Sequence, residues 1–168
     1  MSPIIRHGFV YDLAIRSKSD GRILHIEKAT PNRVPLEGLN DMANCYLKGG
    51  AAPGALYVGL WTGAHIPNGT ETTANFSSMV TEATNYLQTG RLPLTLGTVA
   101  NGAVSNAASL ARFDMTGTAT VNGAFISTVQ AKEAATGKLL SVVRFANPRA
   151  VDDTVYLEIL TGFQFVSL

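Results

Sequence analysis

Short β-prone runs fill this chain after residue 50. The runs are 55–61, 92–96, 108–114, 118–121, 124–129, 139–145 and 154–160, and 162–166 continues the last. Turn-forming residues separate them: Asn-Gly pairs at 68–69, 101–102 and 122–123, and Thr-Gly-Lys at 136–138. Strands at this spacing, without intervening helices, predict a mainly β fold, an antiparallel β-sandwich or barrel.

Residues 35–49 carry the one convincing helical pattern. Its apolar positions are Leu36, Leu39, Met42 or Ala43, and Tyr46, which recur every three or four residues. Pro35 suits the first turn and Gly49-Gly50 ends the helix. We expect one short amphipathic helix whose apolar face packs on a larger body. Residues 79–84 allow one further helical turn at most, and 62–78 form a long loop.

The first 34 residues predict a hairpin or extended arm ahead of the sandwich. Two short apolar runs, 9–15 and 22–27, flank the turn-prone segment 17–21. We therefore divide the chain into an N-terminal arm or hairpin, 1–34, and a β-sandwich domain, 35–168, that opens with the helix. The hairpin could pack on its own domain or on another protein.

Charge is scarce and unevenly placed. Asp, Glu, Lys and Arg make up 15% of the residues, and 92–111 contain none of them, against about 25% in an average domain. A surface with few charges is suited to lying against other protein. Residues 1–35 hold six basic and three acidic side chains, a balance of +3, which leaves −2 for the rest of the net charge of +1.

This balance is typical of ordinary solvated surface, and it also allows an arm that reaches an acidic partner. The arm residues that we assign to partner binding are Arg6, His7, Phe9, Tyr11, Arg16, Arg22 and Arg33. A net charge near zero gives no indication of specific nucleic-acid binding.

Residue patterns for catalysis or metal binding are missing from the sequence. His7, His25 and His65 lack metal-ligand spacing, and the single cysteine, Cys45, allows neither an internal disulfide nor a cysteine-based zinc site. Nucleophile-elbow and phosphate-loop motifs do not occur, and Asp152-Asp153 fits a turn. We expect no enzyme activity and no cofactor. The N-terminal residues lack an apolar signal segment, so we expect no membrane association and assembly in a cytoplasm.

Several segments in order resemble a family of small structural proteins of tailed bacteriophage virions. Asn32–Gly50 is similar to the family's opening N-x-x-P-x-E-G-L-N…L-K-G-G, and Leu56–Trp61 to its strand W-Y-V-G-L-F. Further similar segments follow at 81–86 ahead of Arg91, and at 106–113, 122–126, 137–140, 144–145 and 151–155. The resemblance covers about residues 32–168, and Asp152 departs from it because a glycine is usual there.

The resemblance implies a jelly-roll-like β-sandwich located on the virion and assembled in the host cytoplasm. We favour a capsid decoration, or cement, protein that bridges major capsid subunits and forms homo-oligomers. One alternative is a collar, tail or fibre-attachment component. Another is a carbohydrate-binding jelly-roll module, for which the loop 62–78 offers one aromatic residue, Phe76.

Overall fold

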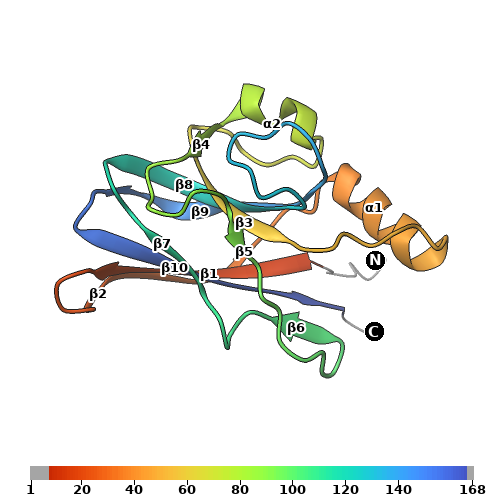
Figure 1. Cartoon of the computed structure of the whole chain (residues 1–168), viewed down its shortest axis with the longest axis horizontal. Helices are drawn as coiled ribbons and strands as arrows, with labels where there is room; N and C mark the ends of the chain where they lie inside the picture. The colour runs from red at the N-terminus through yellow and green to blue at the C-terminus, as the bar shows by residue number, and fades with distance from the viewer. Residues whose placement is uncertain (1–7, 166–168) are drawn as a thin grey trace, which may run out of the picture.

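The computed structural model describes residues 8–165 and consists of two packed β-sheets with two short helices (Figure 1). The strands are β1 (Gly8–Ser17), β2 (Ile23–Pro31), β3 (Tyr57–Thr62), β4 (Thr81–Ala83), β5 (Leu92–Pro93), β6 (Ala103–Ser105), β7 (Ala111–Asp114), β8 (Ala119–Ser127), β9 (Leu139–Val151) and β10 (Val155–Gln164). The helices are α1 (Leu36–Leu47) and α2 (Thr73–Met79).

Every strand pair in the two sheets is antiparallel. Sheet A has the order β2-β1-β10-β6, and β7 also pairs with β10. Sheet B has the order β4-β3-β8-β9, and β5 also pairs with β3. The predicted mainly β, antiparallel sandwich is confirmed, whereas a jelly-roll-like connectivity stays a prediction.

The main core lies between the facing sides of the two sheets. Alternate residues of β1, such as Tyr11 and Leu13, point inward and meet Leu60, Ile126 and their neighbours from sheet B. Alternation of this kind buries one face of each strand, and burial of the aliphatic and aromatic side chains is the main force that holds the sheets together.

Sheet B also carries a second apolar cluster on its outer face. Trp61, Phe125 and Val142 point outward there, and Phe76 of α2 covers them, with its ring 5.1 Å from that of Phe125. Figure 1 shows α2 above this sheet, while no helix covers the outer face of sheet A in residues 8–165.

The N-terminal hairpin is present but is not a separate arm. β1 lies between β2 and β10 and pairs with β10 from Gly8 to Ser17, so it is an interior strand of sheet A. Within residues 8–165 the chain therefore does not divide at residue 34, because strands from both proposed parts share one sheet. A hairpin signal is local, so the sequence did not reveal that β1 also pairs with the distant strand β10.

Three local predictions were wrong. Asn122-Gly123 lies inside β8 rather than at a turn, so the predicted runs 118–121 and 124–129 form one strand. Residues 81–83 form β4 rather than a helical turn. The loop 62–78 contains a second helix, α2, which begins at a capping box in which Thr72 and Asn75 exchange side-chain and backbone hydrogen bonds.

Candidate functional site

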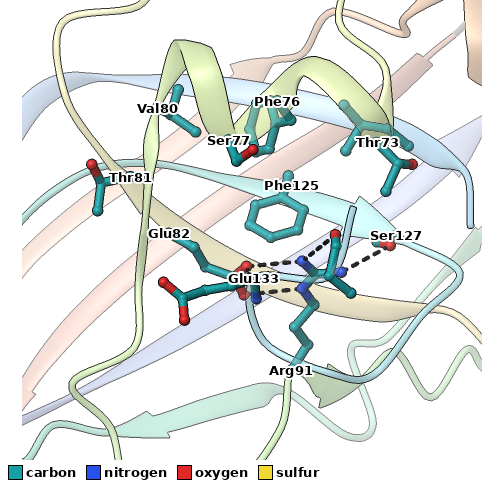
Figure 2. Close-up of a pocket in the computed structure, with 12 residues that line it drawn as sticks. Thr73, Phe76, Ser77, Val80, Thr81, Glu82, Arg91, Phe125, Ser127 and Glu133 are labelled. Carbon is teal, nitrogen blue, oxygen red and sulfur yellow. Dashed lines mark hydrogen bonds and ion pairs between the residues drawn. The ribbon is translucent and has the colours of Figure 1, made fainter. Parts of the chain in front are cut away.

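The first candidate is a cavity of about 130 Å³ between α2 and sheet B (Figure 2). Phe76 and Val80 line it from the α2 segment, and Glu82, Arg91 and Phe125 line it from the opposite side. Figure 2 shows the guanidinium of Arg91 beneath the ring of Phe125, with its centre 4.9 Å from the ring centroid. A buried arginine beside a cavity is a possible anion site, so its hydrogen bonds decide the question.

All five N–H donors of Arg91 are already used within the protein. Nε and Nη2 donate to the two carboxylate oxygens of Glu82 at 2.9 and 2.8 Å. Nη1 donates to Ser127 Oγ and to the Val129 carbonyl, both at 3.1 Å, and Nη2 also donates to the Ala134 carbonyl at 3.4 Å. Because a guanidinium has five donors, none remains for a ligand. Arg91 therefore ties β4, β8 and the segment after β8 together.

A second buried carboxylate organises the loop between β3 and α2. Glu71 is fully buried, and its Oε1 lies 2.7 Å from His65 Nε2. The backbone N–H groups of Asn68 and Gly69 donate to its two oxygens at 2.7 and 2.8 Å. From outside the loop, Arg144 Nη1 donates to the His65 carbonyl at 2.8 Å. These bonds give the loop one conformation.

The hydrogen bonds also set the ionisation of Glu71. Burial favours the neutral carboxyl group, but the bonds from the Asn68 N–H, the His65 ring and the Gly69 N–H outweigh burial and hold the pKa of Glu71 below its usual 4.5. A carboxylate whose pKa is lower in the folded state contributes stability at pH values above its unfolded pKa. That contribution is lost as the pH falls through the folded pKa.

We therefore expect Glu71→Gln to lower the free energy of unfolding at neutral pH. Below about pH 4.5 the free energy of unfolding of the variant should fall less steeply with pH than that of the wild type. Urea unfolding at a series of pH values measures both effects. Asp153→Asn, which changes an exposed carboxyl group, is expected to keep the wild-type pH dependence. Parallel curves for Glu71→Gln and the wild type would contradict this role of Glu71.

The third candidate is the face of α1 that points away from the molecule. Leu36, Leu39, Tyr46 and Leu47 share one stripe of the helix, and their exposed fractions are 60, 47, 90 and 75%. Ala43 lies on the same stripe and is also exposed. The larger body on which this apolar face was expected to pack is not the rest of this domain, because the helix meets the domain through its opposite face, where Gly38 is buried.

Two residues of the first turn hold α1 in this orientation. Oε2 of Glu37 accepts hydrogen bonds from the backbone N–H and hydroxyl of Thr73 and from the N–H of Leu139, at 2.9, 3.1 and 2.8 Å. Gly38 is the buried residue of the helix, and a Cβ there would lie 2.9 Å from the Leu139 carbonyl oxygen and from Leu140 Cα. Only a glycine lets the helix approach β9 this closely.

The seven residues predicted to bind a partner do not form one surface. Arg6 and His7 lie outside the described residues. Phe9 and Tyr11 are core residues with exposed fractions of 6 and 0%, and the Tyr11 hydroxyl donates to Ser141 Oγ at 2.7 Å. Their assignment as partner contacts was wrong, because on β1 their alternating positions face sheet B.

The three arginines of the set lie in different surroundings. Arg16 is half-buried and its Nε donates to Glu158 Oε2 at 2.7 Å. Arg22 is exposed beside Asp20, near the turn between β1 and β2, at the end of the molecule opposite α1 (Figure 1). Arg33 is exposed and its backbone pairs with Val142, next to the start of α1. Of the seven, Arg33 alone lies near the apolar stripe within the described part of the chain.

No group of three or more His, Cys, Asp or Glu residues in 8–165 is placed to hold a metal ion. In the same residues neither helix has the length and apolar character needed to span a bilayer.

Comparison of the chain with protein-family models, with curated proteins and with solved structures found no match.

Proposed function

We propose that this protein is a structural component of a bacteriophage virion, and most specifically a capsid decoration protein that bridges major capsid subunits. The observation that carries the proposal is the orientation of α1: its apolar stripe is exposed while Gly38, on the opposite face, is buried. Contiguous exposed apolar side chains on an ordered helix are typical of protein–protein contact surfaces.

Two further features support assembly as the role of the chain. The charge-free segment 92–111 adds exposed, uncharged surface, including Val99 and Leu110 with exposed fractions of 69 and 38%. The buried charges of Arg91, Glu82 and Glu71 are each bonded within the protein. A protein that binds only the assembled shell stabilises it by mass action, and many copies strengthen a modest contact through avidity.

The carbohydrate-binding alternative loses its one aromatic contact in the segment 62–78. Phe76 is 7% exposed and packs edge-on against Phe125 beneath α2, so it presents no face to a sugar. We therefore do not retain this alternative.

Quantitative mass spectrometry of purified particles tests the proposal. We expect the protein in a simple integer ratio to the major capsid protein, as the symmetry of a shell requires. About a dozen copies per particle would instead place it in a collar or tail ring. Absence from the particles would overturn the proposal.

A further inference from the structure

We infer that the outward face of α1 is the docking surface of this protein, and that its partner presents an apolar groove with an acidic rim. The inference rests on the proposed function and adds the chemistry of the partner site. Its apolar part is the stripe Leu36, Leu39, Ala43, Tyr46 and Leu47. A large amphipathic side chain such as Tyr46, which is 90% exposed, is a frequent anchor in protein interfaces.

The charged side chains at the two ends of the stripe are cationic. Arg33 lies beside Gly69, whose carbonyl accepts the N–H of Leu36 at the start of α1. Lys48 follows the last turn at the other end of the helix. Both cations are exposed. A rim of this sign attracts a partner with acidic side chains at matching positions.

The acidic side chains of the helix do not offset this rim. The Glu37 carboxylate is turned inward, where it is held by Thr73 and Leu139. Asp41 is half-buried and lies one turn after Glu37, toward the face that carries Gly38. The exposed side of α1 is therefore apolar, with a cation near each end and no carboxylate on the stripe.

The same charges argue against a second copy of this chain as the occupant. Antiparallel packing of two α1 helices would place Lys48 of one copy beside Arg33 of the other. Parallel packing would place each of these cations beside its equivalent. Both arrangements bring like charges together at an apolar contact, which is unfavourable.

The helix is also ordered before it binds. The bonds of Glu37 and the close approach at Gly38 fix the first turn of α1 against β9 and α2. A helix that is ordered before it binds loses little conformational entropy in the complex, so more of the contact energy is available as affinity.

The test measures binding of the purified full-length protein to capsid shells isolated from particles that lack it. We expect Tyr46→Glu and Leu47→Glu each to weaken binding at least about tenfold. Each substitution places a carboxylate in the apolar contact, beside the acidic side chains of the partner. The matched control is Leu87→Glu, since Leu87 is 70% exposed but lies outside α1. Thermal melting verifies that the variants remain folded.

The acidic rim is tested separately through charge. Binding should weaken as sodium chloride is raised, and Lys48→Glu should weaken it about threefold to fivefold and reduce the salt dependence. Lys28→Glu, an exposed change on β2, should leave both unchanged. Binding that is independent of salt and of Lys48 would overturn the acidic rim.

The remaining outcomes distinguish the inference from the proposed function. Shell binding by the wild type that Tyr46→Glu and Leu47→Glu do not weaken would overturn the role of α1 and leave the virion function standing. Absence of wild-type binding to shells would contradict the function itself. Two outcomes would assign the face of α1 to a different occupant and overturn the inference. One is binding of the wild type to phosphatidylserine vesicles but not to shells. The other is a dimer, detected by sedimentation equilibrium, that dissociates when Leu47→Glu is introduced.

Discussion

Replacing Gly123 with alanine is expected to destabilise the protein by about 3 kcal/mol or more. Gly123 lies in the middle of β8, opposite Trp61 of β3 and Arg144 of β9. An added Cβ would collide with the Val143 carbonyl oxygen and would lie 2.5 Å from the indole ring of Trp61. Neither neighbour can move freely, because Trp61 is fully buried and its Nε1 donates to that same carbonyl at 3.0 Å.

Urea or thermal unfolding of Gly123→Ala measures this effect. Gly54→Ala is the matched control, because nothing lies within 4 Å of a Cβ at that position, and its stability should stay within about 0.5 kcal/mol of the wild type. Near wild-type stability of Gly123→Ala would show that Trp61 and Val143 can rearrange, and would contradict the close packing of β3 on β8.

Replacing Arg91 with leucine is expected to cost about 3–5 kcal/mol, because it leaves the Glu82 carboxylate buried without its partner. The exposed fractions of the two side chains are 4 and 7%, so both charged groups are largely withdrawn from bulk water. The substitution also leaves the Val129 carbonyl without the bond that Arg91 donates to it. Equilibrium unfolding in urea measures the loss.

Two comparison variants make this prediction specific. Arg112→Leu removes an arginine that pairs with Asp114 but is half exposed, so its loss should cost at most about 1 kcal/mol. The double variant Arg91→Leu with Glu82→Leu should recover part of the lost stability, because no buried charge is left unpaired. A double variant less stable than Arg91→Leu would mean that Glu82 contributes mainly through its bond to the Glu133 N–H.

Much of the secondary structure could be predicted because its signals are local. The spacing of apolar residues in 36–47 and the glycines that follow predict α1, whose bounds fall within the expected 35–49. The Asn101-Gly102 pair forms the expected tight turn, with both φ angles positive and a bridge between Ala100 and Ala103. Short β-prone runs and turn residues were sufficient for the mainly β class.

Elements whose local signal is ambiguous were predicted wrongly. Asn-Gly is a strong turn pair, but at 122–123 the close packing of Trp61 requires a glycine inside a strand. The helix α2 has only seven residues, too few for a clear apolar period. Its detectable signal was Thr72 followed by Asn75, a capping box in which asparagine replaces the more usual Glu or Gln.

An antiparallel β fold with a helix near its start follows from the sequence alone, because strand alternation, turn residues and helical periodicity act over a few neighbouring positions. Which surfaces are exposed depends on contacts between residues that are distant in the sequence. Phe9 and Tyr11 became core because their side of β1 faces sheet B, and Arg91 became structural because it pairs with the Glu82 carboxylate. The apolar stripe of α1 faces outward because Glu37 and Gly38 bind the opposite side of the helix to residues distant in sequence. An amphipathic pattern shows that a helix has an apolar face, but contacts between distant residues decide what that face meets.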